Sequence, residues 1–320
     1  MFERVTIETN MLFRALAIFG VVAHHADFIA FPGGAAFLLA LAGYNYQRFK
    51  LKSFVRENSP WPSTARYEIR LVRPYLIVVC LFFAWKGVFQ WDTLLMVSVL
   101  LGNESVTIFR LWFIQALVQA TLLIAVIFSI PSVRRAAQQK GWLVALMLFA
   151  ASTTLTLINR AYPDLPLIGG ELTLGRWLSV VFLGWLAGEA QSRWQKAIFI
   201  AITLAYCTYF FELTSTTYWI AVGFSATVLL ESFPGPQAFA ALVNNVARSS
   251  YYTYLSHLAV FYVVELGLRS DSPAVWTCIA MFVGWLAWYV VEKRGVPFLA
   301  INTLRSIWSR KASARTLPER

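Results

Sequence analysis

Charged residues are scarce in this sequence. Asp, Glu, Lys and Arg make up 13% of its 320 residues, whereas an average soluble domain carries about 25%. Hydrophobic residues make up 58%, and they form repeated runs of about 17–22 residues, the length that an α-helix needs to cross a bilayer. The runs do not alternate between apolar and polar residues, which excludes a transmembrane β-barrel. We therefore predict an all-α polytopic membrane protein.

Cysteine is also rare, and the positions of the cysteines argue against a protein that binds a metal through cysteine and against one held together by disulfides. Cys80, Cys207 and Cys278 each stand alone inside an apolar run, with neither metal-ligand spacing nor an evident disulfide partner. We therefore predict no metal site. The net charge of +11 would suit a nucleic-acid partner, but most basic residues lie in the links between apolar runs, where the positive-inside rule places them. We expect contact with the lipid bilayer and none with nucleic acid.

About ten transmembrane helices are predicted. Their ranges are 11–30, 35–49, 71–89, 108–130, 142–158, 176–191, 197–213, 217–233, 250–268 and 274–291. The first apolar run lacks a small-residue cleavage site, so we interpret it as a retained helix and not as a signal peptide. Residues 1–300 form one integral-membrane domain, and 301–320 form a basic cytoplasmic tail. Because we see no soluble domain in the sequence, the membrane bundle itself must perform any chemistry.

The apolar segment 91–102 is too short for a standard span, and basic residues decide how we interpret it. Segments 50–73, 131–141, 192–196 and the tail after 292 are basic. All four fall on the same side only if 91–102 does not cross the membrane. Following the positive-inside rule, we predict a re-entrant segment, with both termini in the cytoplasm. Irregular backbone at membrane depth is tolerated where it lines a cavity, which places this segment near a candidate site.

The first predicted span, "MLFRALAIFGVVAHHADFIAF", holds an arginine and two of the three histidines in the chain. Arg14 and His25 are eleven residues apart, so a helix brings them to the same face, separated by roughly 16 Å along its axis. His24 points about 100° away from His25. Ionisable groups within a span are costly and indicate function, although Arg14 could also reach the inner interface and the histidines could bridge helices. Imidazole can act as a general base that removes a proton from a hydroxyl group.

A second cluster is "RYEIRLVRPY", at the cytoplasmic end of the third predicted span. Arg70 and Arg73 are three residues apart and lie on the same side of a helix. Two guanidinium groups there suit a ligand that bears phosphate. The alternative is that they serve only the positive-inside pattern and contact lipid headgroups.

Five stretches of the sequence resemble the membrane acyltransferase-3 family, in the same order. They are "FRALAIFGVVAHH" (13–25), "RLVRPY" (70–75), "RLWFIQAL" (110–117), "ARSSYYTYLSHLAVF" (247–261) and "WYVVEKRGVPF" (288–298). The resemblance implies an integral-membrane O-acyltransferase of the bacterial inner membrane. Such an enzyme moves an acyl group, typically acetyl, from cytoplasmic acyl-CoA to a hydroxyl of a glycan or glycolipid. Acyl-CoA is then a co-substrate, and we expect no bound cofactor.

The resemblance also implies roles for individual residues. His25 is the general base, Arg14 orients the donor or polarises its carbonyl, and Arg70 and Arg73 hold the phosphates of CoA. Trp112 lines the substrate site, and we add His24 and Gln119 to that lining. Many family members have Ser and Glu where this chain has Phe113 and Leu117, so a carboxylate on that helix is missing.

A general base needs a partner that orients it, and we name Asp92 and Glu265 as candidates. For His257 we expect only a helix–helix or backbone hydrogen bond. Two other functions stay open. A transporter or flippase for a glycolipid or polysaccharide intermediate would use buried Arg and His as a pathway, although we see no inverted repeats. A scaffold for a synthesis complex would need no ionisable residues within its spans.

Overall fold

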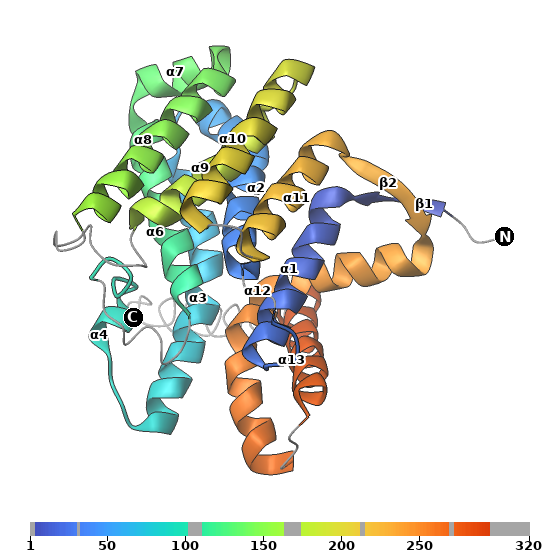
Figure 1. Ribbon diagram of the computed structural model, residues 1–320. Coiled ribbons are helices and arrows are strands. Elements are labelled where there is room, and N and C mark those ends of the chain that lie inside the picture. The colour runs from blue at the N-terminus through green and yellow to red at the C-terminus, as the bar shows by residue number, and fades with distance from the viewer. Residues whose placement is uncertain are drawn as a thin grey trace, which may run out of the picture.

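The computed structural model describes residues 4–30, 33–101, 111–162, 174–211, 215–268 and 272–294. Within these ranges the chain is mainly helical (Figure 1). The helices are α1 (Thr9–His25), α2 (Gly34–Arg56), α3 (Trp61–Lys86), α4 (Trp91–Leu94), α6 (Trp112–Ser129), α7 (Pro131–Gln139), α8 (Gly141–Ala161), α9 (Leu174–Glu189), α10 (Arg193–Phe211), α11 (Ser215–Leu229), α12 (Gln237–Leu268) and α13 (Pro273–Trp288). The π-helix η1 (Tyr289–Lys293) continues α13. The predicted tail, 301–320, lies outside the described residues.

Each of the ten predicted span ranges holds a helix, as expected from the apolar runs. Among the described residues, three helical segments are long and apolar enough to cross a membrane: α6, α8, and α13 continued by η1. Others are shorter than a full span, such as α1 with 17 residues and α11 with 15. A helical membrane fold is therefore confirmed, while the number of crossings and the side on which the termini lie stay predictions.

Within residues 91–101, the described part of the segment predicted to be re-entrant, there is one short helix. α4 is four residues long, and turns follow it until the described part ends at residue 101. Two glutamines one turn apart on α6 hold these turns. Gln115 Oε1 accepts a hydrogen bond from Ser98 Oγ at 2.6 Å, and Gln119 Nε2 donates to the Met96 carbonyl at 2.7 Å. Such a segment cannot cross a bilayer as a helix.

Two strands, one helix and the first part of another helix were not expected from the sequence. β1 (Arg4–Glu8) and β2 (Ser232–Pro236) form an antiparallel ribbon in which Arg4 pairs with Pro236 and Glu8 with Ser232. α7 is a separate short helix between α6 and α8. α12 begins 13 residues before its predicted span, at Gln237. In Figure 1 its first part runs across the view beside β2, and its later part runs down beside α1. The ribbon thus ties the start of α1 to the start of α12.

Glycine allows α2 and α9 to approach each other closely. A Cβ atom on Gly43 of α2 would lie 2.0 Å from the Val181 carbonyl oxygen, and one on Gly184 of α9 would lie 1.8 Å from the Ala40 carbonyl oxygen. Only glycine fits at either position. Close backbone contact at small residues is a common way of packing helices in membranes, where lipid is as apolar as the side chains.

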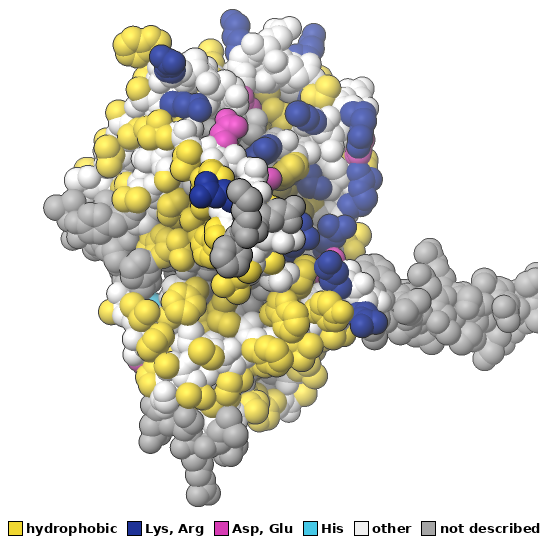
Figure 2. All heavy atoms as spheres, turned by 90° about the vertical axis from the view of Figure 1, so that its right-hand side faces the viewer, with side chains coloured by type: hydrophobic (Ala, Val, Ile, Leu, Met, Phe, Trp, Pro, Cys, Tyr) yellow, Lys and Arg dark blue, Asp and Glu magenta, His cyan; other side chains and the backbone are white. Residues whose placement is uncertain are grey.

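Charge is unevenly distributed over the surface. On the face shown in Figure 2, Lys and Arg side chains gather over the upper part of the molecule, whereas hydrophobic side chains cover the lower part. Exposed hydrophobic side chains include Leu81, Val263 and Phe282, which are 65%, 65% and 59% exposed. Apolar surface of this extent needs a hydrophobic surrounding, and in a multi-pass membrane protein lipid provides it.

Candidate active site

A cavity of about 680 Å³ is lined mainly by α1, α2, α3, α6 and α12, with further residues from β1, α13 and η1. Its volume is within the range of about 300–1,000 Å³ that is typical of small-molecule sites. Its described lining carries more basic than acidic side chains. The basic ones are Arg14, Lys50, Arg70 and Arg248, and the acidic ones are Glu8 and Glu292. A cleft with surplus positive charge attracts a ligand with several negative charges.

Arg14 comes to this cavity from the middle of α1 and is fixed there by α12. Its Nε donates a hydrogen bond to Oγ of Ser250 at 2.8 Å. Ser250 itself is buried. Because a guanidinium has five N–H donors, this bond orients Arg14 and leaves donors that can serve a ligand in the cavity. Arg14 thus lines the cavity, held by α12.

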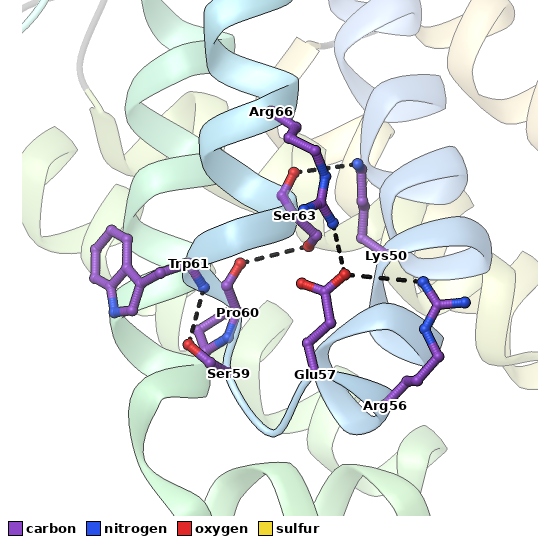
Figure 3. A network of polar contacts seen from close by, with 8 residues as sticks. All are labelled: Lys50, Arg56, Glu57, Ser59, Pro60, Trp61, Ser63 and Arg66. Atoms are coloured by element: carbon purple, nitrogen blue, oxygen red, sulfur yellow. Dashed lines mark hydrogen bonds and ion pairs between the residues drawn. The ribbon is translucent and has the colours of Figure 1, made fainter.

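Figure 3 shows the polar contacts that the basic residues form at the connection between α2 and α3. The Glu57 carboxylate forms ion pairs with Arg66 at 2.5 Å and with Arg56 at 3.8 Å. Lys50 reaches from α2 to α3, where its Nζ donates to the Ser63 carbonyl at 3.3 Å. Glu57 therefore offsets charge at the turn itself, while Lys50 also lines the cavity.

Arg70 and Arg73 have different positions. Both are exposed on α3, but Arg70 lines the cavity and Arg73 is not among the described lining residues. Their spacing places them on the same side of the helix, yet only the turn that bears Arg70 reaches the cavity wall.

The end of α1 brings His25 to His257 on α12. Nδ1 of His25 lies 2.8 Å from Nε2 of His257, and Nδ1 of His257 lies 2.7 Å from the Tyr254 carbonyl oxygen. The two rings are nearly parallel, at 13°, with centroids 5.1 Å apart. His257 is fully buried, at 0% exposure, and His25 is half-buried. His24 is also half-buried, with its ring centroid 5.9 Å from that of His25.

Tyr254 links the cavity to the histidine pair. Its side chain lines the cavity beside Phe113, with ring centroids 5.0 Å apart, while its carbonyl accepts the hydrogen bond from His257. The described lining includes neither His25 nor His257. The pair therefore lies behind the wall that Tyr254 and Phe113 help to form.

The other predicted lining residues contact protein. Trp112 packs against Trp177 of α9, with centroids 4.3 Å apart and the rings tilted by 31°, and Gln119 donates a hydrogen bond to the backbone carbonyl of Met96. On α6, the side chains that line the cavity are Phe113 and Leu117, the two positions at which the sequence departs from the family pattern.

Of the two carboxylates predicted as partners of His25, Asp92 lies on α4 and Glu265 lies on α12, the helix that also bears His257. Asp92 is buried in α4, where its Oδ1 accepts a hydrogen bond from the Thr93 amide at 2.8 Å. Glu265 is exposed on α12, more than two turns beyond His257. The group that the structure places against Nδ1 of His25 is the imidazole of His257.

Arg248 and Ser250 were not identified from the sequence as residues of this site, whereas the helix–helix and backbone hydrogen bonds expected for His257 are present, to His25 and to Tyr254. Arg248, Ser250 and His257 all belong to the stretch "ARSSYYTYLSHLAVF" (247–261). That stretch, which holds the remaining histidine of the chain, was the available signal.

Comparison with protein families identifies the family of the chain. The profile of the acyltransferase-3 family, described as an acyltransferase domain, matches residues 11–292. The chain belongs to this family. No curated protein and no solved structure matches it. The matched range holds every described lining residue of the cavity except Thr6, Glu8 and Asn10. This multi-pass membrane protein is therefore an acyltransferase.

Proposed function

We propose that this acyltransferase transfers an acyl group, acetyl in the simplest case, from cytoplasmic acyl-CoA to a hydroxyl of a glycan or glycolipid in a bacterial inner membrane. One observation carries the proposal. A basic cavity lies beside α1 at Arg14, and a hydrogen-bonded histidine, His25, lies farther along the same helix. A ligand-binding region and a potential base therefore share one helix, about 16 Å apart along its axis.

The basic side chains of the cavity suit the donor. CoA carries several phosphate charges at one end and its thioester at the far end of a long flexible arm. Arg70, Lys50 and Arg248 would hold the phosphates, because guanidinium and ammonium groups bind phosphate through charge-assisted hydrogen bonds. Arg14 lies deeper along α1 and would meet the arm or the thioester carbonyl. Rotation of Tyr254 and Phe113 would open the wall between the cavity and His25.

The chemistry is a direct acyl transfer. His25 takes the proton of the acceptor hydroxyl, and the oxygen attacks the thioester carbonyl. Arg14 stabilises the negative charge that develops on the carbonyl oxygen. The C–S bond then breaks, and the leaving thiolate receives the proton from His25. The products are the ester and free CoA, so His25 returns to its starting state.

The distribution of Lys and Arg over the surface supports entry of the donor from the cytoplasmic side of the membrane. Lys and Arg gather at one end of the face shown in Figure 2, and the positive-inside rule assigns such an end to the cytoplasm. Cytoplasmic acyl-CoA would then enter at the basic end, and the acceptor would approach His25 from deeper in the membrane.

Acyl transfer in proteoliposomes tests this proposal. Purified protein, reconstituted with a bacterial lipid extract that contains lipid-linked glycans, receives radiolabelled acetyl-CoA. We then measure both label in the lipid fraction and release of free CoA. His25→Ala should lower kcat by roughly 10²- to 10⁴-fold, the usual contribution of a general base. Ala150→Val, on an exposed position of α8 that is not among the described lining residues of the cavity, is the control and should stay within about tenfold of the wild type.

The same assay separates donor binding from chemistry. Arg70→Gln should raise KM for acetyl-CoA by about tenfold with little change in kcat, because it removes a contact made before the reaction. Arg73→Gln should change KM much less. Label transfer that survives in His25→Ala would overturn the role of His25. Movement of a glycolipid across the bilayer without CoA release would instead show a flippase.

A further inference from the structure

The hydrogen bonds of the histidine pair have a defined direction. A carbonyl oxygen can only accept, so Nδ1 of His257 must carry the proton that it donates to Tyr254. In a neutral ring, Nε2 of His257 then bears the lone pair. In its contact with Nδ1 of His25, 2.8 Å away, this nitrogen is therefore the acceptor and not the donor. Nδ1 of His25 therefore carries a proton, and Nε2 is its basic nitrogen.

The opposite direction is disfavoured by burial. For His257 to donate to His25, the His257 ring would need protons on both nitrogens and thus a positive charge. This ring is 0% exposed and lies between Tyr254 and Phe261 of its own helix, with centroids at 5.5 and 5.7 Å. An ion in such an apolar surrounding is costly unless it is paired. The neutral arrangement is the one that fits.

We infer that His257 is a positioning residue for the transfer reaction: it holds His25 in the tautomer whose Nε2 can accept the proton of the acceptor hydroxyl. This inference rests on the proposed function and adds the partner of the base. His257 takes the place that a carboxylate has in a serine-hydrolase triad, where the third group fixes the tautomer and orientation of the imidazole.

Nδ1 of His257 contacts a backbone carbonyl, and this has a chemical consequence. A carbonyl oxygen cannot take up a proton at neutral pH, so a proton removed from the acceptor hydroxyl stays on Nε2 of His25. From there it passes to the thiolate when the C–S bond breaks. The backbone of α12 also fixes the His257 ring, because Tyr254 lies one turn before it on the same helix.

Two conservative variants of His257 show whether this residue positions His25 or serves only its own helix through the bond to the Tyr254 carbonyl. The amide of Gln reaches about as far as Nε2 of histidine and can accept from His25. The shorter amide of Asn reaches about as far as Nδ1 and can bond only its own helix. His257→Gln should keep kcat within about tenfold of the wild type, whereas His257→Asn and His257→Leu should lower it on the order of 10²-fold. KM for acetyl-CoA should stay unchanged in all three.

A higher kcat in His257→Asn than in His257→Gln would overturn the inference. If His257 serves only its own helix, His257→Asn keeps kcat and His257→Gln loses it. Thermal unfolding of each purified variant shows whether a loss of activity reflects a loss of folded protein. If the wild type transfers no acyl group, or if His25→Ala matches it, the proposed function fails, which is a different outcome from either ranking.

A spectroscopic measurement tests the tautomer without any substrate. The chain has only three histidines, so ¹⁵N-histidine labelling gives three resolvable rings in proteoliposomes, and His24→Gln assigns one of them. We expect protonated Nδ1 and unprotonated Nε2 for both His25 and His257 at neutral pH. An unprotonated Nδ1 on His25 would overturn the inference even if every variant failed to fold.

Discussion

α2 meets α9 and α1 meets α12 through contacts of opposite kinds. Between α2 and α9, Gly43 and Gly184 bring backbone against backbone, with no space for even one added carbon atom. Between α1 and α12, polar side chains cross the interface, from Arg14 to Ser250 and from His25 to His257. Both interfaces lie within the part of the chain that belongs to the acyltransferase family.

The difference separates stability from chemistry. Close apolar packing is a main source of stability for helices in a membrane, whereas a hydrogen bond between them contributes only about 0.6 kcal/mol on average. Buried Arg and His are costly there and occur where they have a function. We therefore expect changes in the α2–α9 contact to reduce the amount of folded protein. Changes in the α1–α12 contact should lower activity in a protein that is still folded.

The largest effect should come from filling the glycine contact. In Gly184→Val, a Cβ atom would lie 1.8 Å from the Ala40 carbonyl oxygen, and this backbone atom cannot move aside without shifting α2. Overpacking of this kind costs about 1–3 kcal/mol or more. We expect a marked drop in melting temperature and in the yield of monodisperse protein in detergent. Ala150→Val, on an exposed position of α8, is the control and should melt like the wild type.

A smaller effect should come from the polar contact at the cavity. Ser250→Ala removes the acceptor of the Arg14 Nε bond, and we expect kcat/KM to fall about two- to tenfold, which corresponds to roughly 0.5–1.5 kcal/mol. The melting temperature should barely change. Arg14→Lys keeps the charge but loses the planar fork of donors, so its activity should fall further.

The double variant makes this test specific. If Ser250 acts by orienting Arg14, Ser250→Ala should have no further effect in the Arg14→Lys background. Fully additive losses in kcat/KM would contradict that role and would indicate that the two residues act separately.

Most helices could be predicted from the sequence because each coincides with an apolar run. The elements that could not be predicted lack such a run. α7 is short and polar, the start of α12 mixes polar with apolar residues, and β1 pairs with a β2 strand that contains two prolines and a glycine. Pairing between segments more than 220 residues apart leaves no local pattern that marks it.

The candidate site was predictable along one helix and not between helices. Helical spacing places Arg14 and His25 on one face. The spacing of Arg70 and Arg73 could not show that only Arg70 reaches the cavity. Likewise, no pattern within α1 indicates that α12 packs against it with His257 opposite His25. Such facts depend on tertiary packing.

The smallest effect is expected from the carboxylates, and it bears directly on the α1–α12 contact. If His257 orients His25, then Glu265→Gln, on an exposed position of α12, should leave kcat within about twofold of the wild type, as surface substitutions usually do. Asp92→Asn keeps an oxygen that can accept from the Thr93 amide, so it too should leave kcat nearly unchanged. A fall of about 100-fold in kcat in either variant, with an unchanged melting temperature, would show a carboxylate acting on His25. In that case the α1–α12 contact seen here would be one state of the site, and the acid would replace His257 in the reacting state.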